Sequence, residues 1–267
     1  MRCGTCEGRV NRLVSLFAAS LLALLAPHFA HGETAQEIIA AADAVRYPGH
    51  PFRLTNNLVE YVDGVPRNRS MLVVFAKLDE GTGQFNDLIR YAAPPRDQGK
   101  LVLFAGSKMW FYDPASRASV RISPQQRLLG QASNGDVLTQ NYARDYKARL
   151  DGEETIEDAA RQPRDCWHLD LTAASDDAVY SRIEYWVERG SHFPIKMRYY
   201  SDSGRLLKVA YYRKFDDVFG RKRPSDTILI DAVDNKHVTT MTLSDWRLQD
   251  IPDSWFQREF LPHLRVD

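Results

Sequence analysis

The sequence carries no net charge. Its 267 residues include 35 Lys and Arg and 35 Asp and Glu, which cancel at neutral pH. A chain without net charge has no general field to concentrate nucleic acid or an anionic membrane near it, so either partner would need a local patch. We therefore expect no nucleic-acid partner and only transient contact with a membrane surface.

Cysteine is almost absent as well. Cys3 and Cys6 precede an apolar run near the N-terminus, so neither stands where a bacterial lipoprotein has its lipidated cysteine, after such a run. Cys166 is the one cysteine beyond that run, and a single thiol forms neither an internal disulfide nor a cysteine metal cluster. The fold must therefore be held by its core, which a chain of this length with 44% hydrophobic residues can supply.

Catalytic signatures are missing too. The sequence has no G-x-S-x-G elbow, no H-E-x-x-H, no P-loop and no G-x-G-x-x-G after a strand. No two of the five histidines beyond residue 33 have the spacing that would bring them together on one helix face. The sequence thus predicts a protein that is not an enzyme and that has no cofactor, metal site or catalytic residue.

Three polar clusters leave alternatives open. His168 and Asp170, or the Asp176-Asp177 pair, are compatible with a nonstandard esterase. The pair and the acidic stretch 153–158 also fit solvated connections between strands. The basic run 221–224, Arg-Lys-Arg-Pro, fits a charged turn between strands, or a contact with an anionic lipid headgroup or with an acidic patch of a partner.

The first 32 residues have the pattern of a secretory signal peptide. A basic segment with three arginines precedes residues 13–27, which are almost wholly apolar, and Ala30-His31-Gly32 offers small residues for a cleavage site. The apolar run is shorter than the roughly 20 residues that span a bilayer, which favours cleavage over an uncleaved anchor. We expect one secreted domain over residues 33–267.

A short helix should follow the cleavage site. Thr34 and Glu37 have the spacing of a capping box, in which each side chain accepts a hydrogen bond from the backbone of the other residue. Apolar residues then recur on one helical face, at Ile38, Ile39, Ala42 and Val45. Since Pro48-Gly49 ends the pattern, the sequence predicts a helix over residues 35–45.

Beyond Pro51 the apolar residues alternate with period two, which is typical of strands. Turn signals at Asp63-Gly64 and at residues 105–107 predict two hairpins, which join residues 58–62 to 71–76 and residues 100–104 to 108–112. Further strands are expected over residues 88–92, 145–150, 166–171, 180–187, 195–200, 205–214, 227–233 and 237–248. Only residues 136–142 and the segment after Pro252 have a helical pattern. Such closely spaced strands predict a mainly β fold with a curved antiparallel sheet.

The few helices are a small cover for so wide a sheet. A twisted sheet of about ten strands tends to curl, and its concave face must be covered. Because three short helical segments cover little of it, we expect the curled sheet to leave an apolar hollow suited to an apolar ligand. A sheet sandwich filled by its own side chains fits the same pattern.

One hairpin carries a specific motif, Trp110-Phe111-Tyr112-Asp113-Pro114, preceded by residues 101–108, LVLFAGSK. This segment resembles the W-F-Y-[DN]-P strand of the periplasmic LolA-like lipoprotein carriers. Nearly the whole chain beyond residue 33 is similar to a related branch, the outer-membrane lipoprotein-sorting proteins. The motifs that carry this wider resemblance are Lys100-Leu101, residues 130–136, Tyr185-Trp186-Val187, Pro194-Ile195-Lys196, residues 202–208 and residues 251–261.

The resemblance implies a half-open barrel of antiparallel sheet around a few helices, with an apolar cavity for acyl chains. It further implies a non-enzymatic carrier, which takes lipidated cargo from an inner-membrane transporter, of RND type for this branch, towards the outer membrane. The cargo would be an acyl chain of a lipoprotein or of a free lipid. Lipoprotein carriers place a basic residue near the cavity, and the candidates for it here are Lys77 and Arg90.

Aliphatic and aromatic side chains on one face of the strands are predicted, by alternation, to line the cavity. They are Val73, Phe75, Ile89, Tyr91, Leu101, Leu103, Phe111, Ile183, Tyr185, Met197 and Met241. Which face of the hairpin over residues 100–112 lines the cavity stays open. The leading hypothesis is a periplasmic carrier of lipid or lipoprotein. The alternative is an envelope sensor or regulatory domain on the same scaffold, which detects lipid or misrouted lipoprotein without moving it.

Overall fold

The computed structural model describes residues 32–175 and 178–264. The predicted signal peptide lies outside the described residues apart from Gly32, and so does the Asp176-Asp177 pair. Residues 33–267 belong to one compact unit, and the fold below is the fold of this unit.

The first element is the predicted helix. α1 (Ala35–Arg46) begins at the capping box: the Thr34 hydroxyl accepts the Glu37 N–H at 3.2 Å, and the Glu37 carboxylate accepts the Thr34 N–H at 2.8 Å. The predicted apolar face is fully buried at Ile38, Ile39 and Ala42. The prediction over residues 35–45 is therefore confirmed, and the helix extends to Arg46.

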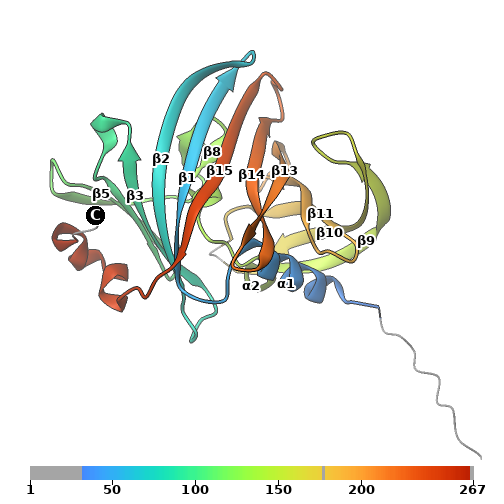
Figure 1. Ribbon diagram of the computed structural model, residues 1–267, viewed down its shortest axis with the longest axis horizontal. Helices are drawn as coiled ribbons and strands as arrows, with labels where there is room; N and C mark the ends of the chain where they lie inside the picture. Colours follow the sequence, from blue (N-terminus) through green and yellow to red (C-terminus); the bar gives the residue numbers. More distant parts are fainter. Residues whose placement is uncertain (1–31, 176–177, 265–267) are drawn as a thin grey trace, which may run out of the picture. The chain divides into compact units, whose positions relative to one another are not determined.

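Thirteen strands form one antiparallel sheet in the order β6-β5-β4-β3-β2-β1-β15-β14-β13-β12-β11-β10-β9 (Figure 1). They are β1 (Phe52–Val62), β2 (Val65–Leu78), β3 (Phe85–Ala93), β4 (Leu101–Ala105), β5 (Lys108–Asp113), β6 (Ala118–Ile122), β9 (Tyr146–Glu157), β10 (Pro163–Ala173), β11 (Arg182–Glu188), β12 (Pro194–Tyr200), β13 (Leu206–Val218), β14 (Arg221–Asp231) and β15 (His237–Leu248). Over the described part of the chain, β6 and β9 are the two edges, so the sheet is open. The predicted mainly β fold, a half-open barrel, is confirmed.

Both predicted hairpins are present. Asp63 and Gly64, with φ of 52° and 74°, connect β1 to β2, and Gly106, with φ of 58°, lies between β4 and β5. A backbone with positive φ favours glycine and, next to it, aspartate or asparagine. Local turn chemistry thus explains why these hairpins were predictable. A short 3₁₀ helix, η1 (Pro95–Asp97), follows β3.

The sheet curls around α1. This helix contacts β9, β11 and β14, and β9 lies five places from β14 in the sheet. In a flat sheet, strands spaced by about 4.8 Å would put β9 and β14 about 24 Å apart. A helix with its side chains is only about 10–12 Å wide, so it can reach both strands only if the sheet bends around it. α1 therefore lies on the concave face, below β13 and β11 in the view of Figure 1.

The connection between the two edge strands crosses the concave face. Residues 123–145 run from the end of β6 to the start of β9, and contain β7 (Arg127–Leu129), β8 (Ala132–Ser133), η2 (Asn134–Val137) and α2 (Tyr142–Asp145). β7 contacts β1 and β2, whereas α2 contacts α1 and β9. In place of the single helix predicted over residues 136–142, the structure has two short helices, η2 and α2. They belong to the segment that crosses the concave face, and this segment and α1 together cover that face.

The C-terminal segment covers the opposite, convex face. Its 3₁₀ helices η3 (Asp253–Phe256) and η4 (Arg258–His263) follow β15, and η3 contacts β3 and β4. The rings of Phe75 and Trp255 meet edge to face, with centroids 5.3 Å apart. In Figure 1 this segment, in red, lies beside β3 and β5. The sheet thus has a second apolar core here, formed by Val73, Phe75, Leu88, Leu101, Leu103, Tyr112, Ile251, Phe256 and Leu261.

Two charged stretches that fitted connections between strands are in fact strands. Residues 153–157 belong to β9, and Arg221 is the first residue of β14. The turn before β14 consists of Phe219 and Gly220, with φ of 52° and 74°. β9 is an edge strand, and most of its residues are exposed or half-buried. Charged side chains are tolerated on such a strand because water reaches it, so alternation gives no signal there.

Candidate functional site

Tyrosine rings fill the middle of the concave face. Tyr142 of the crossing segment meets Tyr146 and Tyr185 edge to face, with ring centroids 5.7 and 6.0 Å apart. Tyr180 and Tyr199 lie 4.5 Å apart. All five side chains are buried. The crossing segment and the sheet therefore meet directly, without a wide gap between them.

The space that remains at the centre is small. It measures about 50 Å³, and its walls include Tyr142, Tyr199, Tyr212, Leu229 and Met241. Pockets that bind small molecules typically measure about 300–1,000 Å³. The expected open hollow at the centre is therefore largely filled. The reason is the crossing connection over residues 123–145, which the sequence pattern did not identify as cover.

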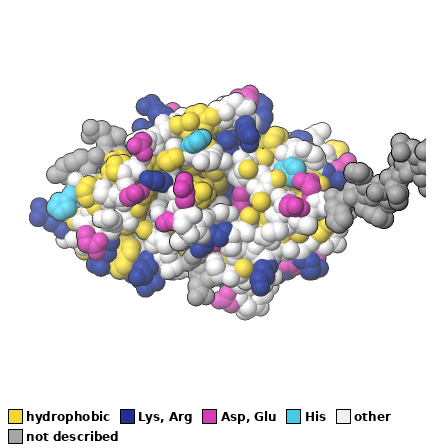
Figure 2. Space-filling view, turned by 90° about the horizontal axis from the view of Figure 1, so that it is seen from below, with side chains coloured by type: hydrophobic (Ala, Val, Ile, Leu, Met, Phe, Trp, Pro, Cys, Tyr) yellow, Lys and Arg dark blue, Asp and Glu magenta, His cyan; other side chains and the backbone are white. Residues whose placement is uncertain are grey.

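A larger space, of about 680 Å³, lies where α1 ends, and we call it the rim groove. Its walls are α1 and the loop after it, α2, the ends of β2, β3 and β15, and the turn between β13 and β14. Its large apolar side chains are Tyr47, Leu78, Phe85, Phe219 and Leu248. Figure 2 shows the unit from below the view of Figure 1, with hydrophobic side chains exposed between charged ones.

An ion pair lies between the rim groove and the central space. Asp43 faces the groove, Arg46 faces the centre, and the Asp43 carboxylate lies 2.9 Å from Nη1 of Arg46. Burial raises the pKa of Asp43 to about 6, although the nearby Arg46 guanidinium opposes this rise. The guanidinium also stacks on the Tyr142 ring, 4.2 Å from its centroid. Tyr47 lines both the rim groove and the central space, so its side chain lies between them.

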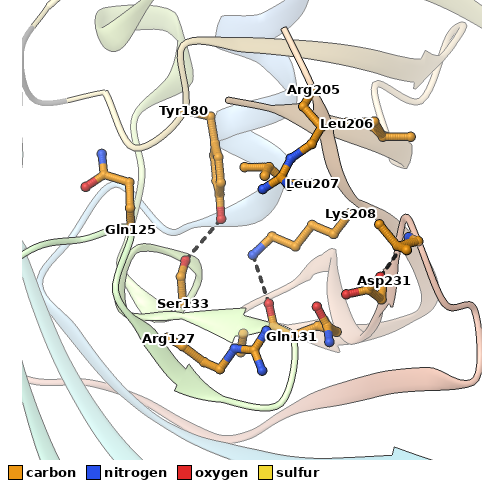
Figure 3. Close-up of a pocket in the computed structure, with 12 residues that line it drawn as sticks. Gln125, Arg127, Gln131, Ser133, Tyr180, Arg205, Leu206, Leu207, Lys208 and Asp231 are labelled. Carbon is orange, nitrogen blue, oxygen red and sulfur yellow. Dashed lines mark hydrogen bonds between the residues drawn. The ribbon is translucent and has the colours of Figure 1, made fainter. Parts of the chain in front are cut away.

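A third, more polar pocket of about 330 Å³ lies at the other end of the β13–β14 hairpin. Arg127, Arg205 and Lys208 lie around it with Asp231 (Figure 3). Lys208 donates to the carbonyl of Gln131 at 3.0 Å and pairs with the buried carboxylate of Asp136. Asp136 itself lines the central space, so this second ion pair separates the polar pocket from the centre. The concave face thus has an apolar end, a filled middle and a polar end.

The predicted cavity residues divide between the two faces of the sheet. Seven lie on the concave face, either buried in its core or packed against it: Ile89, Tyr91, Phe111, Ile183, Tyr185, Met197 and Met241. The other four lie in the convex core under the C-terminal segment: Val73, Phe75, Leu101 and Leu103. Alternation divides a strand into two faces, but it does not tell which face is concave when both are apolar.

The rim groove was missed because strand ends and turns form it. Among the predicted residues only Met241 lines the central space, and none lines the rim groove. A signal did exist, since Phe219 is a large apolar residue beside the turn glycine Gly220 and is 45% exposed. An exposed aromatic residue at a turn is not explained by core packing.

Neither candidate for the basic cavity residue lies in the rim groove. Lys77 pairs with Asp253 at 2.6 Å and donates to the carbonyl of Ile251 at 3.2 Å, so it holds the C-terminal segment against the sheet. Arg90 is adjacent to Ile89, whose side chain lies in the concave core, and alternation directs Arg90 to the other face.

The described residues among those considered for catalysis are engaged in other contacts. Cys166 is fully buried, and burial raises the pKa of its thiol to about 12, which makes it a poor nucleophile. The His168 ring stacks on Trp186 at 4.3 Å and lies 3.3 Å from Glu154. Asp170 pairs instead with Arg182 at 2.7 Å. Asp176-Asp177 lies outside the described residues.

The described residues form neither a metal-binding cluster nor a membrane-spanning helix. Residues 32–175 and 178–264 contain no group of three or more His, Cys, Asp or Glu side chains that could hold a metal ion. Over the same residues, no helix is both long and apolar enough to cross a membrane.

Comparison with known proteins identifies the family. A LolA superfamily protein from Nitrosomonas europaea is 30% identical, has a TM-score of 0.76, and is matched over 86% of this chain and 100% of that chain. A DUF1329 family protein from Desulfovibrio piger has a TM-score of 0.72 at 20% identity, over 85% of this chain and 97% of that chain. A structure described as an outer membrane lipoprotein-sorting protein domain, from Vibrio parahaemolyticus, has a TM-score of 0.71 at 16% identity, over 85% of this chain and 98% of that chain.

No curated protein matches the chain. A family model whose description reads "uncharacterized protein" matches residues 83–263. This model covers most of the sheet, and the Nitrosomonas protein matches over its whole length. The resemblance drawn from the W-F-Y-D-P hairpin is thereby confirmed, and the chain belongs to the LolA superfamily.

Proposed function

We propose that this protein is a non-enzymatic periplasmic carrier that binds acyl chains of a lipid or lipoprotein in its rim groove. In this proposal it takes its cargo from an inner-membrane transporter, of RND type, and moves it towards the outer membrane. Membership of the LolA superfamily and the similarity to a lipoprotein-sorting domain support a role in lipid or lipoprotein binding. The periplasmic location rests on the predicted signal peptide.

The observation that carries the proposal is the rim groove itself. Its volume of about 680 Å³ is within the range of about 300–1,000 Å³ that small-molecule pockets have. It opens beside α1, and apolar side chains from three strands and a turn contribute to its walls. A hydrocarbon chain is the ligand that such walls would favour, because each buried CH₂ contributes about 0.8 kcal/mol.

The filled centre limits how deeply a chain can enter. The groove can take part of an acyl chain as it stands, but the space of about 50 Å³ behind Tyr47 cannot hold the rest. Deeper insertion would require Tyr47 and the end of α1 to move. Partial insertion suits a carrier, since a ligand that must later be delivered should not bind irreversibly.

An uncharged fluorescent acyl ester tests the proposal in solution. Ala40 is an exposed residue of α1 that lines the groove, so the side chain of Ala40→Trp would occupy part of the groove without disturbing the core. Ala118→Trp on β6 is the matched control, because Ala118 is exposed and lines none of the described spaces. We expect the wild type and Ala118→Trp to bind the ester, and Ala40→Trp to bind about tenfold more weakly or worse, which is a loss of about 1.4 kcal/mol.

Two results would contradict this function. If the wild type binds no ester, an acyl chain is not its ligand. If Ala40→Trp binds the ester as tightly as the wild type does, the rim groove is not the binding site. Mass spectrometry of lipids that accompany the protein from a membrane-containing host gives an independent test. A protein that binds lipid but does not pass it to acceptor vesicles would fit the sensor alternative instead.

A further inference from the structure

The rim groove has exposed apolar side chains at its edge. Leu78, Phe219 and Leu248 are 36%, 45% and 50% exposed, and they come from the end of β2, the β13–β14 turn and the end of β15. These three are among eight large hydrophobic residues that are exposed in the described chain, and all three line this one groove. Apolar side chains that converge on one edge of a pocket indicate a contact surface, whereas scattered ones do not.

Two arginines stand in the same wall. Arg221 and Arg223 lie at the start of β14, next to the turn of Phe219 and Gly220. Both line the rim groove. Over residues 32–175 and 178–264, neither arginine has a carboxylate oxygen within 4.0 Å. The two positive charges of this wall are therefore not neutralised by the protein's own acids.

Arg223 is the more unusual of the two. It is only 4% exposed, and its Nη1 donates to the carbonyls of Ala44 and Val45 at 3.0 Å each. Its buried Nε has no hydrogen-bond partner among the residues that the structure describes. The carbonyls at the end of α1 thus satisfy only part of the guanidinium. Burial, and then the neighbouring Arg221, lower the pKa of Arg223, as expected for a cation that lacks a counter-ion.

The other charged groups at the groove do not supply that counter-ion. Asp43 is the carboxylate that lines it, and its oxygens are already engaged by Arg46 Nη1 at 2.9 Å and by the Ala143 N–H at 2.8 Å. His50 lines the groove and adds no negative charge. Lys222, between the two arginines, pairs with Asp217 at 2.8 Å and does not line the groove.

We infer that the rim groove docks on an anionic phospholipid surface, with Arg221 and Arg223 binding the phosphate of a lipid whose chain enters the groove. The exposed apolar edge would contact the hydrocarbon beside that headgroup. A guanidinium suits this role, because its planar donors match phosphate oxygens in pairs. The inference rests on the proposed acyl-chain binding, and it adds the class of lipid and the place of entry. It also gives a role to the two arginines of the basic run over residues 221–224.

Binding of the full-length chain to vesicles tests the inference. The probes are vesicles of phosphatidylcholine alone and vesicles of phosphatidylcholine and phosphatidylglycerol in equal parts. Arg221→Gln is the test variant, since Arg221 is exposed and its replacement should leave the fold intact. Lys222→Gln is the matched control, because it removes the same charge from the next residue of the same strand, outside the groove.

We expect the wild type and Lys222→Gln to prefer the anionic vesicles equally. Arg221→Gln should bind them about fivefold more weakly, the effect of one basic residue near an anionic surface. Equal losses in both variants, or no preference in the wild type, would overturn the inference. So would inorganic phosphate that binds tightly and abolishes vesicle binding, because the site would then be one for the free ion.

The uncharged acyl ester separates this inference from the proposed function. If the ester binds but the vesicle preference is independent of Arg221, the headgroup site is wrong and the carrier function stands. If the Arg221-dependent preference is present but no ester binds, the phosphate site stands and acyl binding is wrong. Unchanged thermal unfolding of Arg221→Gln would exclude a folding defect as the cause of a loss.

Discussion

At the scale of single residues, Asp87 is a buried carboxylate that forms no ion pair with any residue of the described ranges. Its side chain is fully buried in β3, and it accepts hydrogen bonds from the Thr139 hydroxyl at 2.6 Å and from the Thr139 N–H at 3.2 Å. Through Thr139 it ties the crossing segment to the sheet. Burial raises its pKa to about 7, although the hydrogen bonds from Thr139 partly oppose the rise.

This raised pKa makes stability depend on pH. The folded protein holds the Asp87 proton more tightly than the unfolded chain, whose ordinary pKa is 3.8. The stabilisation is therefore present below about pH 4 and is lost as pH rises through about 7. Relative to Asp87→Asn, the wild type should lose about 4 kcal/mol of unfolding free energy over this range. Asn keeps one acceptor oxygen for Thr139, so the variant should fold.

Urea denaturation across this pH range measures the effect. Asp202→Asn, in an exposed turn, is the control and should follow the wild-type profile. A wild type and an Asp87→Asn variant with parallel profiles would show that Asp87 does not titrate as its burial suggests.

The residue scale also explains the divided set of cavity residues. All four side chains from Leu101 to Phe104 are buried. Leu101 and Leu103 belong to the convex core, whereas Val102 and Phe104 belong to the concave core. The period of two does separate the two faces of this strand, but a strand that is apolar on both faces carries no local mark of which face is concave. That assignment depends on which segment covers each face.

At the scale of elements, the β7–β8 hairpin lies close against the sheet. Gly130 joins its two strands with φ of 54°, and a Cβ added there would lie 2.3 Å from Oγ1 of Thr239 and 3.0 Å from Glu60. Thr239 is fully buried in β15, and its hydroxyl accepts the Gln131 N–H at 2.8 Å. Only glycine satisfies both the positive φ and the close approach.

Gly130→Ala should therefore loosen the crossing segment. We expect it to lower the unfolding free energy by about 2 kcal/mol or more, because strain from a positive φ adds to a steric clash. Gly152→Ala is the control in the same protein, since a Cβ there would meet nothing within 4 Å. It should change stability by less than about 0.5 kcal/mol. Equal stabilities of the two variants, measured by urea denaturation, would contradict the observed packing of the hairpin.

Elements were predictable where their signals are local. The capping box of α1, the Asp63-Gly64 turn and the strand over residues 237–248 depend on neighbouring residues, and the structure confirms each of them. β7 and β8 carry no comparable pattern, because they are very short and their partners are distant. The edge strand β9 continued past its predicted end because its charged residues resemble a loop.

At the scale of the whole unit, Cys166 reports on global unfolding. It is fully buried, and burial raises its pKa to about 12, so a thiol reagent should reach it only when the fold opens. A ligand that binds only the folded protein stabilises it, by about 2.7 kcal/mol at a hundred times its dissociation constant. With the acyl ester at that concentration, the labelling of Cys166 should slow about a hundredfold.

The Cys3→Ser, Cys6→Ser variant of the full chain makes Cys166 the one thiol. Its labelling rate, with and without the acyl ester, measures ligand binding without relying on the fluorescence of the ester. Rapid labelling of the native protein would contradict the burial of Cys166. Slow labelling that does not change with an ester known to bind would show that the thiol is reached by local opening.

The amino-acid sequence by itself determined the kind of protein this is. Its alternation, turns and caps specify an antiparallel β unit with one N-terminal helix, and its W-F-Y-D-P hairpin marks the LolA superfamily. Only the tertiary structure decided which part of the concave face is filled and which part stays open. The reason is that the segments that cover this face are far apart in the sequence. The crossing connection over residues 123–145 brings tyrosines to the centre, and strand ends meet α1 to form the groove at the rim. Neither arrangement follows from the order of neighbouring residues, since each arises only when the sheet has curled.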